Sequence, residues 1–273
     1  MQRSRGVNQL SPARAPAVAG FFYPEDSAEL ESAVAAYLAA VPAAPGTAKT
    51  PKALIVPHAG FAYSGPVAAS AYARIAGQRE VIRRVVLLGP SHRVALRGLA
   101  ASSADCFATP LGDVPLDRKA IDSILELPQV QILDAAHRDE HSLEVQLPFL
   151  RYLLADFSLV PLSVGDAEPE QIDEVIERLW GGEETLIVVS SDLSHYYDYE
   201  TARSLDAATT RAIEALDPHG LDSESACGRV PARGLLVAAK QHGLTVETVD
   251  LRSSGDTAGT KREVVGYGSY VFA

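Results

Sequence analysis

The chain has 273 residues, a formal net charge of −11 and 47% hydrophobic residues. This length suits one large α/β domain with a well-buried core, and the acidic balance argues against nucleic-acid binding, which needs clustered Lys and Arg. The sequence contains no run of about 18 apolar residues and opens on a polar segment, so we expect neither a membrane span nor a signal peptide. Two cysteines are too few for a disulfide framework, and we therefore expect a cytoplasmic protein.

The N-terminal part of the chain predicts one helix after an irregular lead-in. Residues 1–13 are mostly polar and are expected to be flexible. Residues 14–24 are rich in Gly, Pro and aromatic residues, which predicts an edge segment that packs Phe21 and Phe22 into the core. A helix is predicted from Asp26 or Ser27 to about Val41, and a small-residue linker follows at 42–51.

Three short apolar runs share one pattern, because each of them is followed within a few residues by a histidine. Residues 53–56, 85–88 and 186–189 precede His58, His92 and His195. Continuous apolar runs bounded by turn residues are typical of strands buried on both faces of a parallel sheet. The carboxyl ends of such strands share the sheet edge at which α/β proteins bind ligands. Because histidine is the commonest metal ligand, the pattern predicts a metal site at this edge.

The remaining elements predict a single α/β domain over residues 1–273, without a repeat or an internal boundary. Helices are predicted at 65–75, at 116–127, at 140–150 with a kink at Pro148, at 169–180, at 200–216 and at 231–242. Strands are predicted at 98–105, 130–133, 158–164, 244–251 and 263–272. The last strand alternates apolar and polar residues, which favours an antiparallel or an edge position.

Cys227 is a second candidate for chemistry, because Cys227-Gly228 stands just before a predicted helix. The dipole of a helix lowers the pKa of a thiol at that place. A thiolate there can bind a metal or act as a nucleophile. Cys106 lies between a possible strand and a turn, and we expect it to be a small core residue.

Two other hypotheses combine the histidines differently. Residues 137–141 read H-R-D-E-H, which fits the H-x-x-E-H pattern of inverted zinc peptidases, although their first half looks like a polar loop. The second hypothesis is a serine-hydrolase triad drawn from Ser91-His92 or from residues 192–195. It is disfavoured because the chain has no G-x-S-x-G elbow and because adjacent Ser and His seldom face each other productively.

Six motifs, in order along nearly the whole chain, resemble the Memo family, whose bacterial and archaeal members are called AmmeMemoRadiSam system protein B. The motifs are P-A-V-A-G-F-F-Y-P at 16–24, P-H-A-G-F-A-Y-S-G at 57–65, G-P-S-H at 89–92, E-H-S-L-E-V-Q-L-P-F at 140–149, S-S-D-L-S-H at 190–195 and C-G-R at 227–229. The resemblance implies a single α/β domain with a mixed, largely parallel central sheet flanked by helices, similar to the catalytic subunit of class III extradiol dioxygenases.

The resemblance also implies roles for individual residues. The metal ligands of the family fall on His58, His92 and Cys227. His195 matches an acid–base histidine and Asp192 its partner beside the metal. The residues expected to line or brace the cleft are Glu140, His141, Glu144, Tyr63 and Tyr23.

The implied function is metal-dependent redox chemistry with Fe(II) or copper, while zinc fits the same ligands. Non-haem Fe(II) oxygenases typically use two histidines and a carboxylate, so a cysteine as third ligand departs from the dioxygenases. The alternative is a non-catalytic module that binds a small molecule, a peptide or a partner protein in the same cleft. The resemblance further implies an AMMECR-type and a radical SAM protein as companions, and it implies neither nucleic acid nor membrane as a partner.

Overall fold

The computed structural model describes residues 13–42 and 50–273. The predictions of a flexible segment at 1–13 and of a linker at 42–51 fall almost entirely on residues 1–12 and 43–49, which lie outside the described residues. Within the described part, no helix is long and apolar enough to cross a bilayer.

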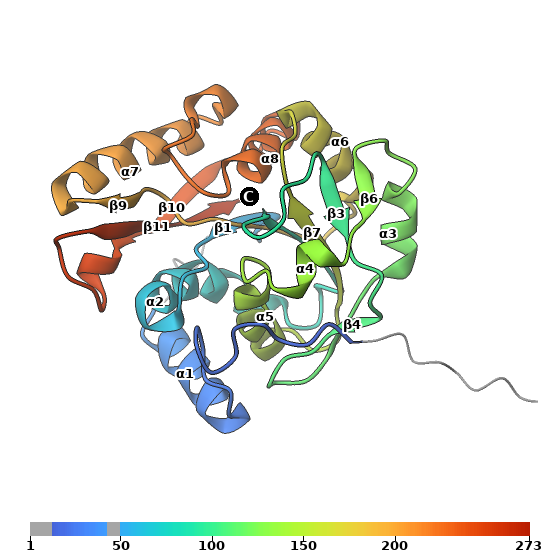
Figure 1. Ribbon diagram of the computed structural model, residues 1–273, viewed down its shortest axis with the longest axis horizontal. Helices are drawn as coiled ribbons and strands as arrows, with labels where there is room; N and C mark the ends of the chain where they lie inside the picture. The colour runs from blue at the N-terminus through green and yellow to red at the C-terminus, as the bar shows by residue number, and fades with distance from the viewer. Residues whose placement is uncertain (1–12, 43–49) are drawn as a thin grey trace, which may run out of the picture.

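The central feature is one mixed sheet (Figure 1). Its strand order within the described residues is β10-β11-β1-β8-β2-β7-β3-β6, and β9 pairs with β11. The strands of this sheet are β1 Ala53–Val56, β2 Arg84–Pro90, β3 Leu99–Ala101, β6 Val130–Ile132, β7 Ser158–Val164, β8 Thr185–Ser190, β9 His195–Tyr197, β10 Val246–Ser253 and β11 Val264–Phe272. A small separate ribbon pairs β4 Cys106–Phe107 with β5 Val114–Pro115.

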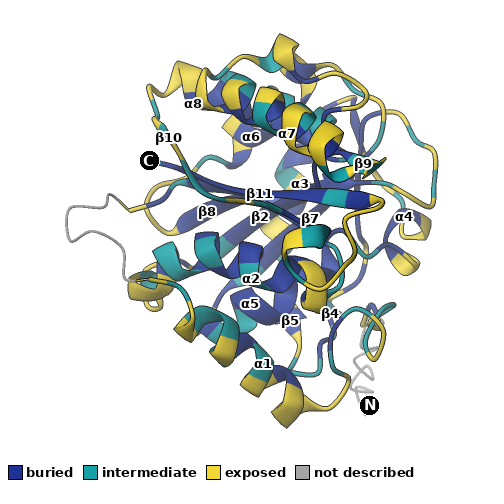
Figure 2. Ribbon diagram, turned by 90° about the vertical axis from the view of Figure 1, so that its left-hand side faces the viewer, coloured by how far each residue is buried: buried dark blue, intermediate teal, exposed yellow. Residues whose placement is uncertain are grey.

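Helices cover both faces of the sheet (Figure 2): α6, α7 and α8 lie on one face, and α1, α2 and α5 on the other. The helices are α1 Ser27–Ala39, α2 Phe61–Tyr72, α3 Arg118–Ile124, α4 Ala135–Arg138, α5 Leu147–Leu153, α6 Pro169–Leu179, α7 Tyr199–Glu214 and α8 Arg229–Gln241. Short 3₁₀ helices occur at η1 Ala73–Gln78, η2 Glu144–Gln146, η3 Pro218–Gly220 and η4 Ser254–Asp256.

The four strands β1, β8, β2 and β7 run parallel at the centre of the sheet. Every residue of β1 and β8 is buried, because helices cover both faces, and this explains why these strands read as continuous apolar runs. The flanking pairs β1–β11, β10–β11 and β3–β7 are antiparallel. The predicted mixed sheet of a single α/β domain is confirmed, and so is the antiparallel pairing of the last strand.

The register brings the carboxyl ends of the three histidine-bearing strands together. Val56 of β1 lies opposite Ser190 of β8, and Leu88 of β2 lies opposite Val189 of β8. The loops that follow these strands therefore leave the same edge of the sheet, which is where α/β folds place their ligands.

Two helix predictions were wrong in position. Helix α2 begins at Phe61 rather than Gly65, and Pro66 lies inside it as its sixth residue, where the missing N–H removes one backbone bond to the carbonyl of Ala62. Pro148 lies in the first turn of α5 instead of kinking a longer helix. The carboxylate of Glu140 accepts the backbone N–H groups of His141 and Ser142, so this stretch makes side-chain bonds where a helix would make backbone bonds.

The packing of Phe21 was also predicted wrongly. Its side chain is 87% exposed, whereas Tyr23 is buried. Gly20 has a positive φ of 79°, and the N–H of Phe21 bonds back to the carbonyl of Val18 in a tight turn. That turn carries Phe21 outward and leaves Tyr23 to enter the core.

Candidate metal centre at the sheet edge

Three histidines meet beyond the carboxyl ends of β1 and β2. Each of His58, His92 and His141 offers one ring nitrogen, and these atoms lie within 4.8 Å of one another. The ring centroids are 4.8 to 5.5 Å apart, and the rings of His92 and His141 are stacked. Imidazole nitrogens suit zinc, copper and iron, so this cluster can hold a metal ion.

Burial keeps two of these imidazoles in the neutral form that a metal requires. Desolvation, with the neighbouring His92 as the next cause, lowers the pKa of His58 from 6.5 to about 3. Desolvation and the neighbouring His58 lower the pKa of His141 to about 4. At neutral pH both rings therefore carry a free lone pair, and the donor set fits a transition metal.

Glu140 is a buried residue that holds His92 in place. Its carboxylate accepts the backbone N–H of His92 at 2.6 Å and lies 2.9 Å from the ring Nδ1 of His92. Burial alone would raise the pKa of Glu140, but these bonds and the charge of His92 outweigh it and bring the pKa down to about 2. The carboxylate accepts, so Nδ1 of His92 carries the proton and its Nε2 is left free.

Asp192 anchors the loop that carries His58. Its carboxylate accepts the backbone N–H of His58 at 2.7 Å. Burial raises the pKa of Asp192, although the bond from His58 and the charge of His195 oppose that shift. Asp192 thus joins the loop after β8 to the loop after β1.

Cys227 reaches the cluster from the segment before α8. Its Sγ lies 3.3 Å from Nε2 of His58, and the backbone N–H of Asp192 points to the same sulfur at 3.3 Å. A Cβ on Gly228 would come within 2.7 Å of the Ser190 carbonyl, so only glycine lets this segment lie so close to β8.

The pKa of the Cys227 thiol moves against the expectation from the helix dipole. Burial is the largest cause and the charge of Asp192 the next, and together they raise this pKa well above its usual value, although bonds from Asp192 and Gly228 oppose them. The effect of the helix dipole on this pKa is outweighed because the sulfur is buried beside the carboxylate of Asp192. At neutral pH the thiol is therefore protonated.

His195 lies at the same edge but outside the group of three. It begins β9, pairs with Val265 of β11, and is half-buried. The next residue, Tyr196, has a positive φ of 62° and is 74% exposed. Tyr63, in the first turn of α2, is 43% exposed, so both tyrosines present their rings to solvent.

Glu144 and Tyr23 form a buried brace behind the cluster. The Tyr23 hydroxyl donates to Glu144 at 2.6 Å, and the backbone N–H groups of Ala17 and Val18 donate to the same carboxylate. Arg14 completes this network through an ion pair with Glu144. The segment 14–23 is thereby fixed to the segment that carries His141, and Phe22 packs against the His141 ring at 4.9 Å.

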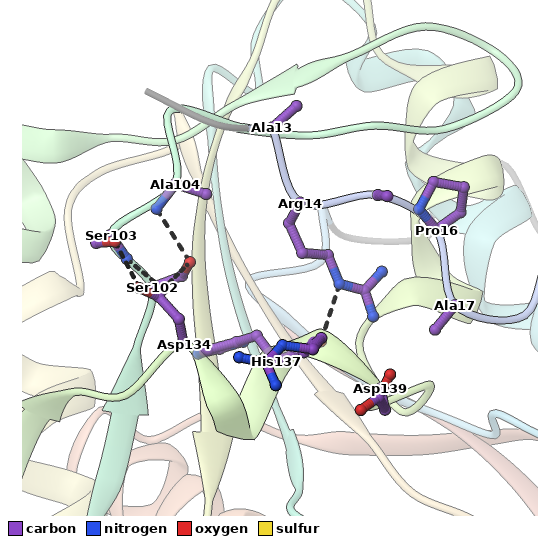
Figure 3. A pocket seen from close by; sticks show the side chains of 12 residues that line it. Ala13, Arg14, Pro16, Ala17, Ser102, Ser103, Ala104, Asp134, His137 and Asp139 are labelled. Atoms are coloured by element: carbon purple, nitrogen blue, oxygen red, sulfur yellow. Dashed lines mark hydrogen bonds between the residues drawn. The ribbon is translucent and has the colours of Figure 1, made fainter. Parts of the chain in front are cut away.

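Arg14 and its neighbours also line a pocket of about 550 Å³, whose lining side chains are drawn in Figure 3. It is lined by residues 13–17, by 102–104 and by α4 with its neighbours, including His137. Nε2 of His137 lies 2.9 Å from the carbonyl of Ala100. His137 is therefore a structural core residue, and the two histidines of the H-x-x-E-H pattern do not converge on one site.

The serine-hydrolase hypothesis requires a serine hydroxyl that is hydrogen-bonded to a histidine. The Ser91 hydroxyl donates to the carbonyl of Val94. Among the described residues, the Ser194 hydroxyl is buried without a hydrogen-bond partner. Neither serine is bonded to a histidine, so no nucleophile–base pair forms here.

The pattern of a strand followed by a histidine did not point to His141. It lies between α4 and η2, in a stretch without regular structure. The available signal was the pair Glu140-His141, because histidines that bind metals commonly donate their other ring N–H to a carboxylate.

The fold and this cluster define an α/β protein with a candidate metal centre at the edge of its sheet. The chain belongs to the Memo-like family, because the family model described as Memo-like protein matches residues 14–271. The resemblance noted from the six motifs is thereby confirmed.

Similar proteins span most of the chain. A MEMO1 family protein of Aquifex aeolicus is 38% identical over 95% of this chain and 98% of its own length. A second MEMO1 family protein, from Ignicoccus hospitalis, is 37% identical over 95% of this chain and 98% of its own length. The crystal structure of the uncharacterized protein JW3007 from Escherichia coli K12 is similar with a TM-score of 0.53 and 13% identity, covering 81% of this chain and 99% of that one. At that identity the likeness concerns the fold alone.

Proposed function

We propose that this protein is a metal-dependent redox protein that uses iron or copper at the sheet edge. The observation that carries the proposal is the convergence of the imidazoles of His58, His92 and His141, whose ligand nitrogens lie within 4.8 Å of one another. An iron or copper ion held there would supply one-electron redox and dioxygen chemistry. Zinc fits the same nitrogens and is the competing metal.

His58 and His92 belong to both of the candidate ligand sets. We take Cys227 as the third ligand, because its sulfur already lies 3.3 Å from Nε2 of His58. A thiolate donates more electron density than an imidazole and favours copper(I), iron or zinc. His141 is the competing third ligand, and its ring stacked on His92 is the observation in its favour.

His195 is proposed as the general acid–base and Asp192 as its positioning partner. Both follow β8 and lie beside the cluster, and the charge of His195 acts on the carboxyl of Asp192. A half-buried histidine outside the ligand group remains free to exchange protons with a bound molecule. Replacing His195 with alanine should leave metal bound and remove turnover.

The first experiment measures metal content after anaerobic purification without an affinity metal, for wild type, Cys227→Ser and His141→Gln. Near-stoichiometric iron or copper that falls sharply in Cys227→Ser supports the set of two histidines and one cysteine. A sharp fall in His141→Gln instead assigns the third position to His141. The loaded protein should also consume dioxygen when reductant is added. Zinc alone, or no metal after reconstitution, would refute the redox proposal.

A second candidate function is a non-catalytic binding module. It is favoured by the exposed aromatic side chains of Phe21, Tyr63 and Tyr196, which are 87%, 43% and 74% exposed. Exposed aromatic residues are common at binding surfaces. The ligand would be a small molecule, a peptide or one of the AMMECR-type and radical SAM companions. Such a module would show no reductant-dependent uptake of dioxygen.

A further inference from the structure

We propose that Ser190 is a positioning residue that holds His58 as the tautomer protonated at Nδ1, so that Nε2 keeps its lone pair for a metal. The inference rests on the proposed metal-binding function and deepens it. Ser190 is the last residue of β8, and its side chain points to the loop that follows β1.

The Ser190 hydroxyl has three polar neighbours. It donates to the carbonyl of Ser142 at 2.6 Å, accepts from the side-chain amide of Gln146 at 2.7 Å and lies 2.9 Å from Nδ1 of His58. A hydroxyl has one proton and two lone pairs. The Ser142 carbonyl can only accept, so it takes the proton. The lone pair that remains faces His58 Nδ1, which must therefore be the donor.

The opposite assignment leaves a buried clash of acceptors. If Ser190 gave its proton to His58, its oxygen and the Ser142 carbonyl oxygen would face each other at 2.6 Å with no proton between them. Both residues are fully buried, so water does not relieve that contact. An unsatisfied buried acceptor costs about 1–3 kcal/mol, which favours the tautomer protonated at Nδ1.

The orientation of Gln146 is fixed in the same way. Its amide nitrogen donates to the carbonyl of Pro57 at 2.9 Å and to Ser190, while its oxygen accepts from the Tyr72 hydroxyl at 2.9 Å. Turning the amide over would place its oxygen against the Pro57 carbonyl, which can only accept. A chain of hydrogen bonds therefore runs from Tyr72 through Gln146 and Ser190 to His58.

The free nitrogen of His58 then faces the site. Nε2 lies 3.3 Å from the Cys227 sulfur, on the side of the ring away from Ser190. His92 is held in the same tautomer by Glu140. His58 and His92, which belong to both ligand sets, thus donate Nδ1–H to different acceptors. His58 donates to the hydroxyl of Ser190 and His92 to the carboxylate of Glu140, and each leaves Nε2 for a metal ion. Such outer contacts fix the tautomer and orientation of histidine ligands.

The test reads the tautomer directly, in metal-free protein labelled with ¹⁵N at histidine. Long-range ¹H–¹⁵N correlation spectra near pH 7 should show His58 protonated at Nδ1 in the wild type. In Ser190→Ala this signature should change to the form protonated at Nε2 or to a mixture, and the affinity for Zn²⁺, used as a redox-silent probe, should fall about 10- to 100-fold. Ser190→Thr keeps the hydroxyl and should restore both readouts.

The control is Ser163→Ala. Ser163 is a fully buried serine near the same end of β7, and among the described residues its hydroxyl has no hydrogen-bond partner. This variant should leave the His58 spectrum and the Zn²⁺ affinity unchanged. Wild-type His58 protonated at Nε2 would overturn the inference, even if Ser190→Ala fails to fold. An unchanged His58 tautomer in folded Ser190→Ala would overturn it as well.

The two proposals fail in different ways. The tautomer is read without metal, and the Zn²⁺ titration needs no redox activity. Wild type that binds Zn²⁺ and shows Nδ1–H on His58, but takes up neither iron nor copper, would refute the redox function and support the role of Ser190.

Discussion

Glu140 holds His92 by two atoms at once, since its carboxylate accepts the backbone N–H at 2.6 Å and contacts the ring Nδ1 at 2.9 Å. The same buried carboxylate also accepts the backbone N–H groups of His141 and Ser142. One side chain therefore sets the ring orientation of one histidine of the cluster and the backbone path of the next.

The first prediction concerns this carboxylate. Glu140→Gln removes the charge and places an amide where several donors converge, so we expect Zn²⁺ affinity to fall about 10- to 100-fold. Isothermal titration of metal-free protein measures it. Asp139→Asn is the matched control, because Asp139 is the exposed neighbour and should keep wild-type affinity. Equal affinities of the two variants would contradict the bracing role.

The central strands of the sheet were predictable, because a strand that is buried on both faces consists of a continuous run of apolar residues. The runs 53–56 and 186–189 became β1 and β8, since a strand covered by helices on both sides tolerates only apolar residues. The sequence left the cap of α1 open between Asp26 and Ser27, and the structure assigns it to Asp26, whose carboxylate accepts two backbone N–H groups. The strand β9 was not predicted, because three residues, one of them Tyr196 with a positive φ, are too few to show the alternation of apolar and polar residues that marks a strand.

The site was harder to predict than the sheet. The strand ends placed His58 and His92 by topology, because parallel strands share one edge. His141 is placed by the long-range bond between Glu140 and the backbone of His92 and by the buried contact of Glu144 with Tyr23, which no local pattern records. The third histidine that the strand pattern suggested, His195, lies outside the group because β9 pairs with β11.

The second prediction concerns stability and the buried pair of Arg14 and Glu144. Both side chains are nearly inaccessible, at 6% and 0%. Arg14→Met leaves the carboxylate buried without its partner, which should lower the free energy of unfolding by about 3–5 kcal/mol. Urea denaturation measures it. Glu247→Gln, at the more exposed pair with Arg74, should cost at most about 1 kcal/mol.

The third prediction concerns pH. Burial lowers the pKa of His137 from 6.5 to about 4. The unfolded chain then binds a proton that the folded chain does not, so the stability from neutral His137 is complete above about pH 6.5 and is lost as the pH falls through 4. Relative to His137→Gln, wild type should lose up to roughly 3 kcal/mol of stability over this range.

Urea denaturation of both proteins at several pH values between 7 and 4 measures the effect. Phe107→Leu is the control, because Phe107 packs on the His137 ring but does not titrate. Its difference from wild type should be the same at every pH. A difference between wild type and His137→Gln that is also constant with pH would show that His137 is not held neutral in the fold.

The last prediction tests the close approach that positions Cys227. In Gly228→Ala the new Cβ would lie 2.5 Å from the Ser191 Cβ and 2.7 Å from the Ser190 carbonyl, so the start of α8 must move away from β8. We expect a loss of about 1–3 kcal/mol in unfolding free energy. Zn²⁺ binding should weaken as well, because the sulfur moves with the segment.

Gly77→Ala is the matched control: nothing lies within 4 Å of its Cβ, and its φ is not positive, so both measurements should stay at wild-type values. If Gly228→Ala lost stability but kept full Zn²⁺ affinity, the position of Cys227 would not matter for the metal and His141 would be the better third ligand.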